Sequence, residues 1–220
     1  TAAPTTGDAS AGLFGSGTGS FRLRGGLLGF MFLDPNLAGY YKIDSVGGTE
    51  TLQVYTGFKN MRGPFAELAW FANENLGVGV DASYLMSDAQ AYTDDERFSV
   101  DAGILVIRSG PYARVTGSAY PVTITAGVGG GVALADLTQR YEDHDQPAED
   151  WTRRALAECL VLASSLELSF PIVGGVGFSG GMEYLFIPTE RLTFTSDDES
   201  QKSVTYREPN LGGLSLRLGL

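Results

Sequence analysis

An alternation of period two runs through most of this chain and constrains its fold more than any other feature. Apolar side chains recur at every second position, with Gly, Ser or Arg between them, most clearly at Leu214, Leu216, Leu218 and Leu220. Successive side chains of a β-strand point to opposite faces, so each such segment has one apolar and one polar face. We count eight segments of this kind after residue 20. The sequence therefore predicts an all-β fold.

The polar faces are too poor in charge for the exterior of a soluble β-protein, which turns its apolar faces inward and keeps Lys and Glu outside. They carry Gly, Ser, Ala and Thr, with isolated charges at Arg22, Arg24, Arg217, Glu67, Asp81, Asp101, Glu167 and Glu183. Such faces suit a narrow polar lumen in which acids and arginines pair. We expect these eight residues to form an ionic network there, with at least one arginine in bidentate contact with a lumen carboxylate.

The apolar faces are then expected to point into lipid. The lipid-facing residues predicted in this way include Phe178, Met182, Phe186, Leu214, Leu216 and Leu218. In hydrocarbon every backbone polar group needs a partner, and only a closed sheet leaves no edge unpaired. No stretch reaches the roughly eighteen consecutive apolar residues of a spanning helix. We therefore predict an eight-stranded, antiparallel, up-and-down transmembrane β-barrel over residues 20–220.

Short and long connections alternate between the predicted strands. Tight turns are expected at Asn73–Gly77 and Pro171–Gly175, and longer connections at Asp34–Gly63, Ser87–Arg97, Tyr141–Trp151 and Thr193–Pro209. Ser109–Tyr120 is the exception, since it belongs to the end with short connections but is longer than a hairpin turn. Residues 64–71 and 153–158 contain helix-compatible residues, but a strand or turn signal follows each, so we predict strands. Aromatic girdles are expected near strand ends, at Tyr84, Tyr112, Tyr120, Tyr141, Trp151, Phe170, Phe186 and Phe194.

Residues 1–19 are predicted to form a separate N-terminal arm. The arm consists mainly of Gly, Ala, Ser and Thr, with Leu13–Phe14 as its only bulky pair. Such a segment buries too little apolar surface to offset its ordering entropy. We expect it to be flexible or docked, either in the periplasmic mouth of the barrel or against a protein partner or second copy of the chain, which would also order some loops.

Charge and composition exclude several kinds of function. The chain has 26 acidic and 15 basic residues, a formal net charge of −11, which argues against nucleic-acid binding. With one cysteine, Cys159, and one histidine, His144, it offers neither an intrachain disulfide nor a Cys/His zinc site. Cys159 lies among apolar residues and is expected to be an inert buried thiol. No metal or cofactor is predicted, and the acidic runs are interpreted as solvated loops.

Several segments resemble a known family. They are the run Phe71–Val80, the Gly110–Tyr112 turn, the glycine-rich strand Ala126–Val132 and the amphipathic C-terminal strand. Together they look like the small eight-stranded outer-membrane barrels of the outer-membrane protein W type and the outer-membrane protein A transmembrane-domain type. The resemblance implies an integral protein of the bacterial outer membrane, with outer-membrane lipid around it and both termini in the periplasm.

The expected role is structural, as a scaffold or surface-interaction barrel with a filled polar lumen. One alternative is a carrier that passes small hydrophobic molecules through the barrel wall. Gly127, Gly129 and Gly131 leave either a pocket for an apolar ligand or room for arginine side chains. A second alternative is a soluble lipocalin-like ligand-binding barrel. We predict no enzymatic activity; the competing hypothesis is a rim hydrolase that uses His144, which lies between Asp143 and Asp145.

Overall fold

The computed structural model describes residues 19–32, 61–92, 96–117, 121–145, 150–173, 176–189, 191–196, 204–207 and 211–220. The strands are β1 (Ser20–Phe32), β2 (Met61–Phe71), β3 (Leu76–Tyr92), β4 (Glu96–Thr116), β5 (Thr123–Asp143), β6 (Trp151–Val173), β7 (Val176–Phe186), β8 (Arg191–Ser196), β9 (Val204–Arg207) and β10 (Gly213–Gly219). Within these ranges, no helix is long and apolar enough to cross a membrane. Apart from Gly19, the predicted N-terminal arm lies outside the described residues.

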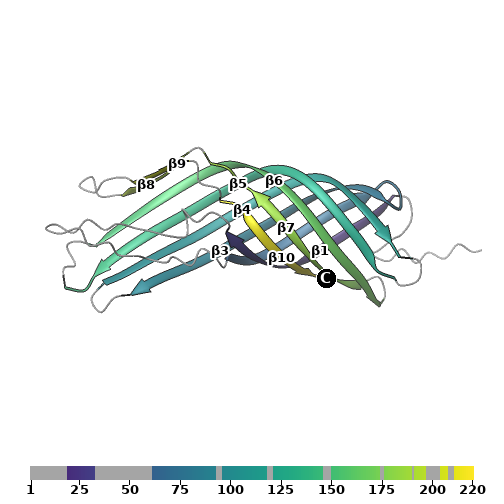
Figure 1. Ribbon diagram of the computed structural model, residues 1–220, viewed down its shortest axis with the longest axis horizontal. Coiled ribbons are helices and arrows are strands. Elements are labelled where there is room, and N and C mark those ends of the chain that lie inside the picture. The colour runs from purple at the N-terminus through teal and green to yellow at the C-terminus, as the bar shows by residue number, and fades with distance from the viewer. Residues whose placement is uncertain are drawn as a thin grey trace, which may run out of the picture.

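Eight of the strands close into a ring in which every neighbouring pair is antiparallel (Figure 1). The order is β5-β4-β3-β2-β1-β10-β7-β6, and pairing between β5 and β6 closes it. Strands β8 and β9 form a hairpin outside the ring, joined to β6 by the pairs Arg153–Ser196 and Arg154–Thr195. The prediction of an eight-stranded up-and-down barrel is confirmed, with this hairpin as an addition.

The two ends of the barrel differ in construction. At the end that we call the turn end, β2 passes to β3 through the bend Ala72–Asn75, where Asn73 Oδ1 accepts hydrogen bonds from the Asn75 and Leu76 N–H groups. At the opposite end, the loop end, β3, β4, β5 and β6 extend beyond the other ring strands on the side of β8 and β9 (Figure 1). The predicted connection Ser87–Arg97 is largely strand, because cross-strand pairing continues as far as Tyr92–Arg97. The predicted connection Tyr141–Trp151 holds between β5, which ends at Asp143, and β6, which begins at Trp151.

Three further local predictions are tested by the strands. The Gly110–Tyr112 segment is not a turn, since it lies inside β4 and pairs with β3 from Gly79 to Gly77. The predicted connection Ser109–Tyr120 is therefore strand as far as Thr116. Both helix-compatible passages, residues 64–71 and 153–158, are strand, as predicted. These segments are strands because each pairs with a neighbouring strand on both sides, and such tertiary context overrides local propensity.

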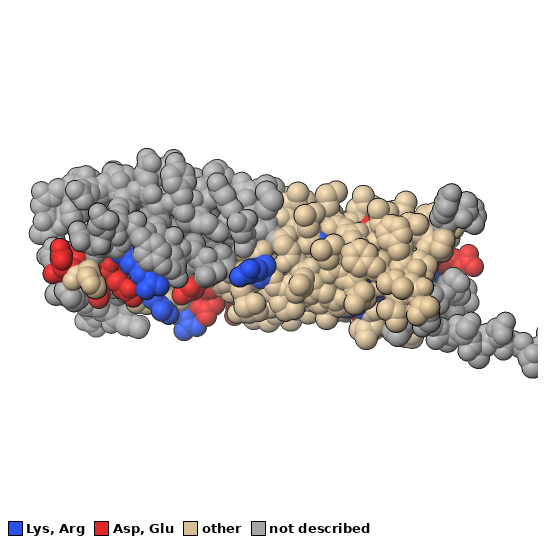
Figure 2. All heavy atoms as spheres, turned by 90° about the horizontal axis from the view of Figure 1, so that it is seen from below, with Lys and Arg blue, Asp and Glu red and all other residues tan. Residues whose placement is uncertain are grey.

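A belt of exposed apolar side chains surrounds the ring on its outer face. On β5 it extends from Ile124 to Leu134, and on β6 from Leu160 to Ile172. Figure 2 shows one face of the barrel, on which the part nearer the turn end is almost free of charged side chains, while acidic and basic side chains gather toward the loop end. Within the belt the alternate side chains point inward; they include polar ones such as Thr125 and Glu167 and, nearer the loop end, apolar ones such as Ala133 and Val161. The barrel wall is therefore apolar outside, with a polar interior in the part of the belt nearer the turn end.

This polarity reverses toward the loop end. We call residues 87–92, 96–103, 135–143 and 151–159 the extension. Inward side chains of its described part, such as Ala102, Leu137 and Tyr141, belong to a buried apolar cluster. Outward side chains, such as Arg140 and Arg154, are exposed and charged. The extension thus has the polarity of a soluble β-sheet on strands continuous with the membrane-type wall.

An ionic lumen as the candidate functional site

The register of the sheet aligns charged residues around the lumen. Arg24, Glu67, Asp81 and Arg108 are direct cross-strand neighbours on β1, β2, β3 and β4. On the other side of the ring, Glu167 of β6 lies opposite Thr125 of β5 and Gly181 of β7. All the charged side chains in this set are inward and no more than 7% exposed.

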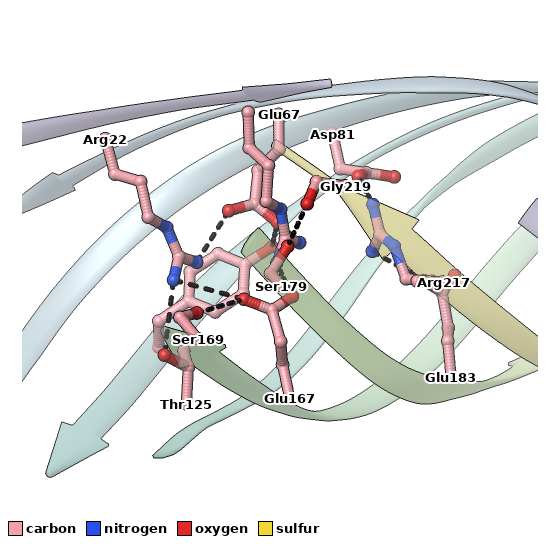
Figure 3. A network of polar contacts seen from close by, with 12 residues as sticks. Arg22, Glu67, Asp81, Thr125, Glu167, Ser169, Ser179, Glu183, Arg217 and Gly219 are labelled. Atoms are coloured by element: carbon pink, nitrogen blue, oxygen red, sulfur yellow. Dashed lines mark hydrogen bonds and ion pairs between the residues drawn. The ribbon is translucent and has the colours of Figure 1, made fainter. Parts of the chain in front are cut away.

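The first part of the network joins Arg22 and Arg24 to Glu67 and Glu167. Arg22 Nη2 donates to Glu67 Oε1 at 2.6 Å, and Arg24 Nη2 donates to Glu67 Oε2 at 2.7 Å. Arg22 Nη1 lies 3.5 Å from Glu167 Oε1, and Arg24 Nη1 also contacts Glu167. Thr125 Oγ1 and Ser169 Oγ complete it with hydrogen bonds to Arg22 and Glu167 (Figure 3).

The second part joins Arg108 and Arg217 to Asp81 and Glu183. Arg108 Nε donates to Asp81 Oδ1 at 3.2 Å, and its Nη2 donates to Glu183 Oε2 at 2.7 Å. Arg217 Nη1 donates to the same Glu183 oxygen at 2.6 Å, while its Nη2 contacts Asp81 (Figure 3). Each part therefore contains two arginines and two carboxylates and is formally neutral.

The arginines bridge carboxylates from different strands. We expected a bidentate contact with a single lumen carboxylate; instead Arg22, Arg24 and Arg217 each contact two acids. Because strands at different positions in the ring are tied together in this way, loss of one side chain leaves several buried partners without a counter-charge. The lumen is cross-linked rather than open at this level.

Lumen aromatics pack against the network and occupy the space over glycines. The guanidinium of Arg217 lies 4.1 Å from the Phe65 ring centroid. Tyr112 donates from its hydroxyl to Glu67 Oε2 at 3.3 Å. Its ring lies so close to Gly79 and Gly127 that a Cβ on either glycine would meet it at 2.8 or 2.6 Å. At Gly127 the space foreseen for a ligand or an arginine is therefore occupied by Tyr112.

A small hollow remains beside Tyr112 between β4 and β5. It is too tight for a water molecule and is lined by residues that include Arg108, Ser165 and the glycines 127 and 129. This hollow does not provide the apolar pocket that a carrier of hydrophobic molecules requires.

Seven of the eight predicted network residues lie together in the lumen, and Asp101 does not. Its side chain is 50% exposed on the outer face of the extension, where Arg140 Nη2 lies 3.9 Å from its Oδ2. The expectation for Asp101 is wrong because β4 has Ala102, Ile104 and Val106 on its inward face. The charged residue that β4 contributes to the lumen network is Arg108. Sequence reasoning missed it, although Arg108 lies an even number of positions from the inward-facing Ala102, Ile104 and Val106.

The six predicted lipid-facing residues all point away from the lumen. Their exposed fractions range from 37% for Leu214 to 60% for Leu216. The lipocalin-like alternative requires these side chains inside the barrel, and the structure places them outside. Among the predicted girdle residues, Tyr84, Phe170 and Phe186 are exposed on the outer face, whereas Tyr112, Tyr141 and Phe194 are buried. Trp151 is half-buried and stacks on Tyr141, and Tyr120 lies outside the described residues.

The two candidate reactive side chains, His144 and Cys159, differ in exposure. His144 is exposed in the bend that follows β5. Its neighbour Asp143 is used in the turn, since its N–H donates to Asp150 Oδ1 at 2.7 Å and its Oδ1 accepts from the Asp145 N–H at 2.9 Å. Cys159 is a buried free thiol in the apolar cluster of the loop end.

Comparison with known proteins bears on the fold. No family model and no curated protein matches the sequence. A major outer membrane protein from Thermus thermophilus aligns with TM-score 0.54 and 16% identity, over 90% of this chain and 96% of that one. The outer membrane protein OprG from Pseudomonas aeruginosa aligns with TM-score 0.54 and 13% identity, over 92% of this chain and 94% of that one. The chain thus has the fold of small eight-stranded outer-membrane β-barrels.

Proposed function

We propose that this protein is an integral outer-membrane barrel with a sealed lumen, and that it serves as a scaffold presenting its loop end outside the membrane. The observation that carries this proposal is the ionic network of the lumen. Its two parts, each formally neutral, connect strands across the lumen, including β1, β7 and β10. A channel needs a continuous polar path, and here arginine and carboxylate side chains fill the lumen at the level of the belt.

The apolar belt supports residence in a bilayer. From Ile124 to Leu134 the backbone of β5 rises about 33 Å, or about 24 Å along the membrane normal at the usual tilt of about 45°. The apolar band of outer-membrane barrels is about 25 Å tall. A wall this apolar outside and charged inside is stable in lipid, whereas in water it would leave a continuous apolar surface exposed.

The apolar cluster at the loop end supports a sealed barrel rather than a carrier. Inward side chains of seven ring strands and β10's preceding residue Leu211 pack there, among them Ile104, Leu137 and Leu185. A hydrophobic cargo entering from the loop end would have to displace these buried residues. We further propose that the turn end faces the periplasm, because short turns lie on that side in outer-membrane barrels and β1 begins and β10 ends toward it.

The proposal excludes catalysis as the primary role and assigns the exposed charged face of the extension to contact with other surface components. His144 then acts as a solvated loop residue. The acidic and basic side chains of this face alternate across strands, as in Asp136 with Arg154 and Glu142 with Arg97. Such a face stays soluble beyond the membrane while its strands remain rigidly paired.

The test measures insertion and sealing on the same purified protein. Folded in detergent, it is expected to migrate differently on gels before and after heating and to resist protease in lipid vesicles. In planar bilayers it is expected to give no stable conductance. A detergent-independent soluble monomer would contradict membrane residence, and a reproducible open channel would contradict the sealed lumen. The positive control for the conductance measurement is the double variant Arg108→Ala with Arg217→Ala. It removes both arginines of the second part of the network.

A further inference from the structure

An unpaired arginine lies at the boundary between the belt and the extension. Arg62 of β2 is exposed on the outer face, and among the described residues it has no hydrogen-bond, ion-pair or aromatic partner. Every other arginine whose side chain the structure describes has at least one such partner, including the exposed Arg97, Arg140 and Arg154. The exception is therefore confined to the position that adjoins the lipid.

The row of residues that contains Arg62 marks the upper edge of the apolar belt. Arg62 stands opposite Gly29 of β1 and Met86 of β3, and the same row continues to Gly103 and Asp136. One outward row nearer the turn end, the corresponding side chains on β1, β4 and β5 are Leu27, Leu105 and Leu134. An ammonium or guanidinium at such a boundary reaches the headgroup level of a membrane while its aliphatic stem lies on apolar surface.

A second donor without a partner among the described residues, the hydroxyl of Tyr84, reaches this row from the outward row nearer the turn end. The Tyr84 ring points toward the loop end, and its hydroxyl lies 2.6 Å from where a Cβ on Gly103 would be. No hydrogen bond of this hydroxyl is present among the described residues. Since Arg62 and Gly103 flank Met86, two strand spacings, about 10 Å, separate their backbones. A headgroup of ordinary size can contact both side chains.

The wall beside Arg62 leaves room for a lipid. A Cβ added to Gly29, the cross-strand neighbour of Arg62 on β1, would meet no atom of the described residues within 4 Å. Deeper in the belt, Gly25, Ala66 and Ala82 form a row of small outward residues across β1, β2 and β3. An acyl chain can approach the backbone closely at this row, while its headgroup lies at Arg62.

We propose that Arg62 and Tyr84 bind the phosphate of an anionic lipid headgroup at the loop-end boundary of the bilayer. This inference rests on the proposed membrane residence. Charge complementarity identifies the occupant, because the Arg62 guanidinium has no carboxylate partner among the described residues, and a phosphate can accept charge-assisted hydrogen bonds from it. We assign this phosphate to a lipid headgroup rather than to free phosphate, since the site opens toward the apolar belt.

The experiment compares lipid retention by native mass spectrometry of the full chain in dodecyl maltoside micelles that contain phosphatidylglycerol or phosphatidylcholine. Arg62→Gln is expected to lower phosphatidylglycerol occupancy about fivefold, and Tyr84→Phe about twofold. Arg97→Gln, which makes the same change in charge on the extension, is the matched control and is expected to leave occupancy unchanged. Inorganic phosphate at the same concentration is expected not to displace the lipid.

The outcomes separate this proposal from the one on which it rests. Equal occupancy in wild type and Arg62→Gln, or equal losses in Arg62→Gln and Arg97→Gln, would overturn the lipid site. Displacement by inorganic phosphate would overturn the assignment to a lipid. Heat-modifiable mobility is measured first on each variant. If wild type fails that test, membrane residence itself is wrong; if all variants pass it, the result concerns the site alone.

Discussion

Arg108 of β4 and Glu183 of β7 contact each other across the lumen, with 2.7 Å between Nη2 and Oε2, although two strands separate them on the shorter path around the ring. Glu183 also accepts from Arg217 of β10. One carboxylate thus connects β4 with the neighbouring strands β7 and β10, neither of which is adjacent to β4 in the ring. The stability of the ring is for this reason sensitive to single side chains inside it.

Arg217→Leu is expected to destabilise the folded barrel by about 3–5 kcal/mol, because Asp81 and Glu183 would keep only Arg108 as a counter-charge. Urea unfolding in detergent, followed by gel mobility, measures the change. Arg154→Leu is the matched control, since it removes an arginine with two contacts to Asp136 on the exposed face. It is expected to cost at most about 1 kcal/mol. Equal stability of wild type and Arg217→Leu would show that the ionic network does not stabilise the folded barrel.

Gly127→Ala is expected to cost about 1–3 kcal/mol, because the new methyl group would meet the Tyr112 ring. A double-mutant cycle with Tyr112→Ala tests the cause: the alanine at 127 is expected to cost much less once the ring is absent. Gly130→Ala, for which an added Cβ meets nothing closer than 3.5 Å, is the control and is expected to be nearly neutral. Additive effects of the Gly127 and Tyr112 changes would contradict direct packing.

Cys159 reports on the closure of the loop-end interior. Its thiol is buried in the apolar cluster, so the folded protein is expected to react with a maleimide far more slowly than the urea-unfolded chain. A Cys159→Ala chain carrying Asn73→Cys at the exposed turn is the control and is expected to react at once. Rapid labelling of native Cys159 would show that this cluster admits solvent, and the carrier alternative would then gain support.

The ion pair between Asp136 and Arg154 is expected to make the stability of the folded protein depend on pH. Hydrogen bonds from Arg154 hold the pKa of Asp136 below its ordinary value. A depressed pKa in the folded state contributes stability above the unfolded pKa, about 3.9, and this contribution is lost as the pH falls through the folded value. Arg154→Gln is expected to raise the Asp136 pKa in a carboxyl NMR titration and to remove this small acid-sensitive contribution. An unchanged titration would contradict the pairing.

The fold and most of the lumen follow from alternation alone, because in a closed sheet the parity of a residue fixes its side of the wall. Arg22, Arg24 and Glu67 could be assigned to the lumen in this way. Asp101 and Arg108 could not, because the rule that places apolar residues outside holds only inside the bilayer. β4 crosses the boundary, and its inward apolar run Ala102, Ile104 and Val106 continues past it into the belt, so the strand has to be followed to Arg108 to see its parity. The pairing of arginines with two acids each depends on distances across the lumen that no local pattern encodes.

The strands of the extension pass through the boundary without interruption. The pairing of β4 with β5 keeps one register from Glu96–Asp143 to Ser109–Gly130, and that of β5 with β6 from Tyr141–Trp151 to Thr123–Ser169. No bulge or break along these stretches can serve as a hinge. A force applied at the tip of the β5–β6 hairpin therefore reaches the bilayer as a torque on the whole cylinder, with the extension as its lever arm. Anchoring that tip would set the inclination of the barrel in the membrane.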